Sequence, residues 1–183
     1  MKALHDEIRI PEFLQELHGQ KATVFDLLLT YLAAVLTTAL VLYQAQPIGL
    51  EAWQFYLLGF LTLDLAGGVV ANFTAGTTRY YQKNPGKRCL FIALHVLQPL
   101  LLYFTFSDPV NMLPLLLITV YTVIAMLVIN HIREYANQRI MGAFLLVLGV
   151  TIAFLEPFSQ PLMLHLVLLY LVKLLLAFAV RWA

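Results

Sequence analysis

Long apolar runs alternate with short polar breaks along the whole chain. We predict helices over six of these runs: residues 24–44, 51–74, 88–106, 111–131, 140–156 and 160–182. About 20 apolar residues in a helix cross the hydrocarbon core of a bilayer, and a run of about 17 is at the low end of the spanning range. The fifth run has about that length. The pattern therefore predicts an all-α, polytopic integral membrane protein with six transmembrane helices.

The breaks between the runs contain residues that end helices. Pro47 and Gly49 follow the first run, Asp108-Pro109 follows the third, and Pro157 and Pro161 lie between the last two. Proline and glycine in short polar segments are typical of turns. The second connection, residues 75–87, is longer and polar. We therefore interpret residues 21–183 as a single transmembrane domain.

Residues 1–20 differ from the rest of the chain because they contain no continuous apolar run. This argues against a cleavable signal peptide. We expect a short interfacial helix that starts near Pro11 and stops at Gly19, with Phe13, Leu14 and Leu17 on its apolar face. The alternative is a partly ordered amphipathic tail.

Composition excludes a sizeable soluble domain. Hydrophobic residues make up 61% of the chain and charged residues only 11%, whereas a soluble domain carries about 25% charged residues. Cys89 is the only cysteine, so an intramolecular disulfide is excluded. The sequence contains no metal-spaced cluster and no P-loop. We therefore predict no metal site and no nucleic-acid partner, and the residues indicate no particular cofactor.

The distribution of lysine and arginine predicts the orientation. They occur before the first run, between runs two and three, between runs four and five, and at the end of the chain: Lys2, Arg9, Lys21, Arg79, Lys83, Lys87, Arg88, Arg133, Arg139 and Arg181. The charged residues of the opposite loops are all acidic: Glu51, Asp108 and Glu156. Because cytoplasmic loops are enriched in lysine and arginine, we expect both termini in the cytoplasm. An inner or plasma membrane is the expected location.

Asp64 is the main candidate for function because it lies near the middle of the second run. A carboxylate at that depth costs about 3 kcal/mol on insertion scales, and such residues usually have a functional role or a partner. Gly67 and Gly68 follow one turn later. Small residues allow a neighbouring helix to approach closely, or they leave room for a ligand. Without a cationic partner the Asp64 carboxyl would favour its neutral form.

The third run carries His95, Gln98 and Pro99. Proline lacks an N–H, so Pro99 cannot donate to the carbonyl of residue 95 and tends to kink the helix. A histidine, a glutamine and a freed carbonyl together form a polar wall. We interpret Asp64 and His95 as candidate catalytic residues, and Gln98 as a candidate substrate contact. The alternative for His95 is a simple hydrogen bond between helices.

Lys173 lies inside the last run, about two turns before Arg181. Its side chain can extend toward the cytoplasmic interface, or it can pair with Asp64 or Asp26. In the second case Asp64 would stay charged and would be structural or would bind a cation. We count Lys173 with the candidate substrate contacts.

Most other polar residues in the runs fall in the predicted cytoplasmic half. Asn72 and Asn130 are further candidate substrate contacts, together with Gly67 and Gly68. Thr77, Thr78 and Arg79 follow the second run and are candidate contacts for an anion or a lipid headgroup. The alternative is a basic loop that touches anionic lipids. This distribution predicts a polar cavity that opens inward.

Three functional hypotheses follow. The first is a small transporter or channel for a proton, ion or small solute, with Asp64 and His95 at its site. The second is a membrane enzyme that acts on a lipid or isoprenoid from the cytoplasmic leaflet, with the same two residues as acid and base. The third is a non-catalytic assembly subunit in which Asp64 pairs with Lys173. The bilayer and a small solute or lipid are the expected partners. A homodimer is possible, since six helices are few for a carrier.

Overall fold

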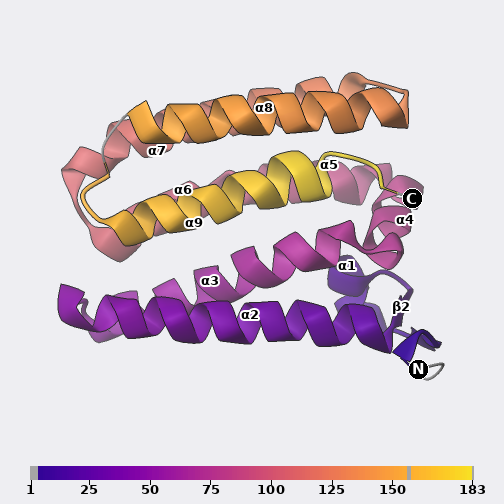
Figure 1. Ribbon diagram of the computed structural model, residues 1–183, viewed down its shortest axis with the longest axis horizontal. Coiled ribbons are helices and arrows are strands. Elements are labelled where there is room, and N and C mark those ends of the chain that lie inside the picture. Colours follow the sequence, from indigo (N-terminus) through magenta and orange to yellow (C-terminus); the bar gives the residue numbers. More distant parts are fainter. Residues whose placement is uncertain (1–3, 156–157, 183) are drawn as a thin grey trace.

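The computed structural model describes residues 4–155 and 158–182, and it is built almost entirely of helices. Within these residues, six helical stretches are long and apolar enough to cross a membrane: Val24–Ile48, Ala52–Phe73, Pro85–Phe106, Pro109–His131, Tyr135–Leu155 and Pro161–Phe178. They run side by side as a bundle (Figure 1). The prediction of six long apolar helices is confirmed.

The N-terminal segment differs from the predicted single helix. Two strands, β1 (Glu7–Arg9) and β2 (Lys21–Thr23), pair antiparallel and flank a short turn of 3-10 helix, η2 (Glu12–Leu14), and the helix α1 (Gln15–His18). Pro11 and Gly19 bound this helical part, as expected. The helix cannot extend toward the N-terminus because the residue before a proline disfavours helical backbone. The β-branched Ile8 and Ile10 favour an extended chain there.

The predicted apolar face of this segment is also only partly correct. Phe13 is 82% exposed. Leu14 and Leu17 are half-buried, whereas His18, which is not part of the predicted apolar face, is only 2% exposed. The His18 ring makes a 2.9 Å hydrogen bond to the hydroxyl of Tyr31. The segment is therefore folded against the bundle through a histidine.

Helix α2 (Val24–Ala45) begins with a capping box. Asp26 N donates to Thr23 Oγ1 and Thr23 N donates to Asp26 Oδ2, each at 3.1 Å. Asp26 therefore serves as a helix cap. A turn of 3-10 helix, η3 (Gln46–Ile48), follows, and Gly49 adopts a left-handed backbone with φ of 74° before α3 (Ala52–Phe73).

The polar connection after α3 contains a helix that was not predicted from the sequence. Helix α4 (Ala75–Lys83) starts directly after Thr74, whose side chain accepts a hydrogen bond from the Thr77 N–H. Only Asn84 separates α4 from α5 (Pro85–His95). A proline at the first helical position suits this start, because its missing N–H has no helical partner there.

The third predicted helix is divided in two. Helix α5 ends at His95 and α6 (Leu97–Phe106) begins at Leu97. Pro99 explains the break, since it removes the hydrogen bond from residue 99 to the carbonyl of residue 95.

The remaining helices are η4 (Pro109–Asn111), α7 (Met112–His131), α8 (Tyr135–Leu155), α9 (Pro161–Leu171) and the π-helical segment η5 (Val172–Phe178). The prediction of a short fifth span was wrong. Helix α8 has 21 residues and begins five residues earlier than expected, because the polar stretch from Tyr135 to Arg139 is helical. The predicted end at Glu156 lies outside the described residues.

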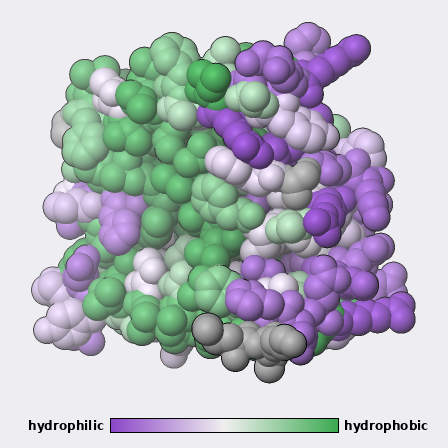
Figure 2. Space-filling model, turned by 45° about the vertical axis from the view of Figure 1, so that its right-hand side comes forward, coloured by the Kyte–Doolittle hydropathy of each residue, from purple (hydrophilic) through white to green (hydrophobic). Residues whose placement is uncertain are grey.

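Helices α3 and α9–η5 occupy the centre of the bundle, and both are mostly buried. The other long helices expose many apolar side chains. Figure 2 shows hydrophobic residues over the middle of the molecule and most of the hydrophilic residues on its right-hand side. Strands β1 and β2, helix α4 and the end of η5 all lie at one end of the bundle (Figure 1). The opposite end is formed by the turns between helices.

Candidate functional site: a buried ion pair

Asp64 of α3 forms an ion pair with Lys173 of η5. The Lys173 Nζ donates to Asp64 Oδ2 at 2.6 Å. The lysine side chain is 2% exposed, whereas the aspartate side chain keeps 37% of its surface uncovered by the chain. Three positions were considered for the Lys173 side chain, and the structure shows the pair with Asp64. The side chain does not extend toward the interface, and it does not pair with Asp26. The two members differ in access: the ammonium is enclosed and the carboxylate is not.

The backbone around Lys173 is adapted to this side chain. A Cβ at Gly68 would overlap with Cε of Lys173 and would lie 3.0 Å from its Nζ, so only glycine leaves the lysine its path. Lys173 itself lies in the π-helical segment. Such segments are rare and occur often at functional sites.

Gln98 of α6 completes the pair from a third helix. Its Nε2 donates to the same oxygen, Asp64 Oδ2. Its Oε1 is buried and has no hydrogen-bond partner among the described residues. A buried acceptor without a donor costs free energy. The Gln98 Oε1 atom is therefore an unpaired acceptor on a side chain that contacts the Asp64 carboxylate.

His95 lies next to the pair but does not join it. Its Nδ1 is 2.7 Å from the carbonyl of Phe91 in its own helix, and its ring stacks on Phe91 at 3.7 Å between centroids. The Lys173 Nζ lies 5.9 Å from the centre of the same Phe91 ring. Within residues 4–155 and 158–182, Asp64 and His95 share no hydrogen bond, so this conformation does not form the acid–base pair expected for an enzyme.

The carbonyl that Pro99 frees does have a partner. Tyr170 of α9 donates its hydroxyl to the His95 carbonyl at 3.3 Å. Tyr170 is fully buried. The kink of the third span is therefore stabilised by a neighbouring helix, as is common for prolines in membranes.

The remaining candidates lie on other surfaces of α3 and beyond it. Gly67 faces α2, where an added Cβ would lie 3.2 Å from Ala34 Cβ. Asn72 is buried, and its Nδ2 has no partner among the described residues. Asn72, Thr77 and Thr78 line a void of about 10 Å³. This volume holds at most one water molecule, so the inward-opening cavity expected from the sequence is closed at this level.

Asn130 contacts a buried arginine instead of the ion pair. Arg88 is 6% exposed, and its Nε donates to Asn130 Oδ1 at 2.9 Å. Its Nη2 donates to the carbonyls of Phe178 and Ala179, at 3.3 and 2.8 Å. The guanidinium therefore caps the carbonyl end of η5. From the sequence, Arg88 was expected only as a cation near the loop between the second and third runs, and no local pattern predicts this role.

The predicted headgroup contacts do not gather at one point. Thr77 Oγ1 donates to the carbonyl of Leu17 at 2.8 Å, and Thr78 Oγ1 donates to that of Asn72 at 3.4 Å. Both hydroxyls therefore donate to backbone carbonyls of the protein itself. Arg79 is exposed and lines a different hollow, next to the N-terminal strands.

The structure thus brings Asp64, Gly68, Gln98 and Lys173 together with His95 beside them. It places Gly67, Asn72, Asn130, Thr77, Thr78 and Arg79 elsewhere. In the part of the chain that the structure describes, no three His, Cys, Asp or Glu side chains come close enough to hold a metal ion. Comparison with known protein families, with characterised proteins and with solved structures found no match.

Proposed function

We propose that this chain is a small membrane transporter or channel for a proton or small cation, and that Asp64 is the group at which the ion binds. The observation that carries the proposal is the unequal access to the ion pair: Lys173 is enclosed, but Asp64 is partly uncovered. An incoming proton or cation therefore meets the carboxylate first. Its arrival weakens the hold of Asp64 on the ammonium.

The energetics of buried ion pairs support a role beyond stability. Replacing such a pair by apolar residues of similar volume is often neutral or stabilising. Here the chain also has a glycine at 68 and a π-helical segment around the lysine. A glycine inside a helix lowers helix stability, and π-helical segments occur often at functional sites.

Gln98 supplies a second ligand for the ion. Its unpartnered Oε1 belongs to the same side chain that donates to Asp64. Carboxylate and amide oxygens are suitable ligands for small, hard cations. In this mechanism the Asp64 carboxylate exchanges Lys173 for the incoming ion, and Gln98 coordinates that ion or keeps the carboxylate oriented.

The proposal includes the orientation. Both termini are cytoplasmic, in an inner or plasma membrane, because the lysines and arginines cluster at the end of the bundle where β1, α4 and η5 lie. In this proposal a second copy of the chain lines the path to the exposed part of Asp64, since a carboxylate facing lipid is costly.

Flux through purified protein in proteoliposomes tests the proposal. An imposed pH gradient or cation gradient should drive flux in the wild type, and Asp64→Asn should lower it at least tenfold. Asp108→Asn is the matched control, because Asp108 only caps the short helix η4. Undiminished flux in Asp64→Asn would remove this residue from the mechanism.

The ion pair itself supports a second candidate, an assembly subunit in which Asp64 and Lys173 only hold the helices together. In that case Asp64→Asn should lower thermal stability, and Asp64→Asn combined with Lys173→Met should restore it, because no unpaired charge remains. Stability restored in the double variant, with no flux in the wild type, would favour assembly over transport.

A further inference from the structure

A polar hollow of about 630 Å³ lies at the end of the bundle that carries the N-terminal strands. Residues from β1, α1, β2, α2 and α4 line it, together with Gln20 and Asn84. Its size is within the range of pockets that bind small molecules, about 300 to 1,000 Å³. Asp64, Gln98 and Lys173 are not among its lining residues, so the hollow is a different site from the ion pair.

The walls of the hollow are fixed against each other. A Cβ at Gly19 would overlap with the backbone of Gly76, and a Cβ at Gly76 would overlap with the carbonyl of Lys21. Direct backbone contact between the N-terminal segment and α4 thus requires both glycines. Tyr81 of α4 adds a 3.0 Å hydrogen bond to the carbonyl of Glu16. The hollow is a preformed part of the fold.

The charges in the lining are unbalanced. Four cations line it (Arg9, Lys21, Arg79 and Lys83) with two acids (Glu7 and Asp26). Both acids are already engaged: Glu7 pairs with Lys21 at 3.4 Å, and Asp26 caps α2. Among the described residues, Arg9, Arg79 and Lys83 have no ion-pair partner. With four cations and two acids, the lining carries a net charge of +2.

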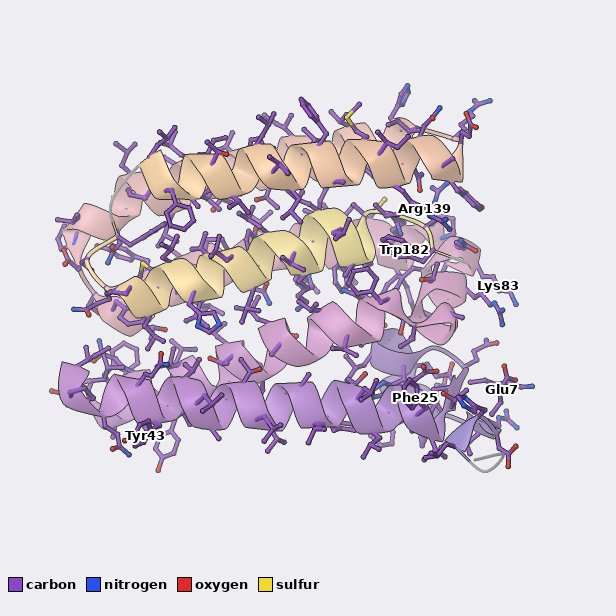
Figure 3. All side chains as sticks on the ribbon, in the orientation of Figure 1. Glu7, Phe25, Tyr43, Lys83, Arg139 and Trp182 are labelled. Atoms are coloured by element: carbon purple, nitrogen blue, oxygen red, sulfur yellow. The ribbon has the colours of Figure 1, made fainter. Side chains whose placement is uncertain are left out.

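The position of the hollow relative to the long helices limits its ligand. Thr23 and Asp26 lie at the start of the apolar helix α2, and Ala75 and Gly76 follow directly on the end of α3. The ends of apolar helices of spanning length lie at the depth of lipid phosphates. Lys83 and Glu7 are both at this end of the molecule (Figure 3).

We infer that this hollow binds a phosphate-bearing anion, with Arg79, Lys83 and Arg9 as its cationic contacts. Arginine fits phosphate through paired N–H donors. The Thr77 and Thr78 hydroxyls take no part, because they hold the backbone. A phospholipid headgroup and a free phosphate compound share this chemistry, and the two sources are separated by experiment.

Binding is measured on the full chain in an uncharged detergent by native mass spectrometry. The probes are short-chain phosphatidylglycerol, short-chain phosphatidylcholine and inorganic phosphate. We expect phosphatidylglycerol to bind the wild type, and Arg79→Gln with Lys83→Gln to weaken binding about tenfold or more, since each cation near a lipid surface contributes about 1 kcal/mol.

The matched control is Arg133→Gln with Arg139→Gln, which removes one exposed cation from the loop between α7 and α8 and one from the start of α8. Neither residue is among those that line the hollow. This control should bind phosphatidylglycerol like the wild type. Equal losses in both double variants, or no loss in Arg79→Gln with Lys83→Gln, would overturn the inference.

The probes also identify the source of the phosphate. If phosphatidylglycerol binds and millimolar inorganic phosphate does not displace it, the ligand is a lipid headgroup. If inorganic phosphate displaces the lipid, and the displacement is lost in Arg79→Gln with Lys83→Gln, the site takes a soluble phosphate compound. Equal binding of phosphatidylcholine would contradict a site built for an anion.

Discussion

The hydroxyl of Tyr170 donates to the carbonyl of His95, 3.3 Å away, and this is the carbonyl that Pro99 leaves without a helical donor. A donor from one helix therefore replaces the hydrogen bond that the proline removes from another. The Pro99 kink places Gln98 against Asp64, and Tyr170 lies one turn before Lys173 in the chain. The hydrogen bond thus connects α5 and α9, which continue into α6 and η5, the elements that supply the partners of Asp64.

Tyr170→Phe should destabilise the fold by about 1 kcal/mol, because it leaves a buried carbonyl without a donor. In a Pro99→Ala background the same substitution should cost much less, since residue 99 then supplies a helical N–H to His95. Thermal unfolding of the four proteins in detergent measures this coupling. Equal costs in both backgrounds would show that Tyr170 does not compensate for Pro99.

Gly68→Ala should lower stability by about 1–3 kcal/mol, the usual cost of overpacking a core. The added methyl group takes the space of the Lys173 side chain, and the enclosed ammonium has to move away from Asp64. Gly86→Ala is the control, because nothing lies within 4 Å of a Cβ at that position. A Gly68→Ala protein as stable as Gly86→Ala would contradict the observed path of the lysine.

Arg88→Met should destabilise the protein by about 3 kcal/mol. It keeps the apolar length of the side chain but removes the donor to the carbonyls of Phe178 and Ala179, and it leaves Asn130 Oδ1 only the 3.5 Å hydrogen bond from Arg181. Arg133→Met, at an exposed site in the same half of the molecule, should change stability by less than about 0.5 kcal/mol. Thermal unfolding of both variants distinguishes a structural arginine from a surface one.

The N-terminal segment should loosen in acid. Burial lowers the pKa of His18 below its ordinary value, so the folded segment holds a neutral imidazole. Below about pH 6.5 the unfolded segment binds a proton that the folded one does not, and stability falls as the pH falls. Above that pH the His18 imidazole is neutral in both states, and the stability of the segment no longer depends on its titration.

Hydrogen exchange of residues 10–23 at pH 7.5 and pH 5.5 measures the effect. The wild type should lose protection at pH 5.5, and His18→Phe should show a flatter pH dependence. A His18→Phe protein with the wild-type pH response would assign that response to another group.

Apolar run length was sufficient to place the long helices, since the period and the breaks are local features of the sequence. The pattern of apolar residues did not predict the helices that are made of polar residues. The stretch from Tyr135 to Arg139 extends α8, and α4 is a polar helix that interacts with the N-terminal segment. Helical backbone satisfies its own hydrogen bonds, so such segments need no apolar pattern.

The site was predictable only in part. A carboxylate and an ammonium inside apolar runs made a pair one of the open alternatives, but the choice of partner depends on packing between residues 109 positions apart. The roles of Arg88 and Tyr170 depend on which carbonyls lie opposite them in the folded chain. No spacing within the sequence contains that information.

At the end of the bundle remote from the N-terminal strands, Asn111 and Ser159 exchange two hydrogen bonds, Asn111 Nδ2 to Ser159 Oγ at 2.8 Å and Ser159 N to Asn111 Oδ1 at 2.9 Å. Asn111 directly precedes α7, and Ser159 lies just before α9. The two helices therefore start from one common anchor. Any rearrangement that separates them at that end has to break both bonds together, so α7 should travel with the lysine-bearing helix as one body.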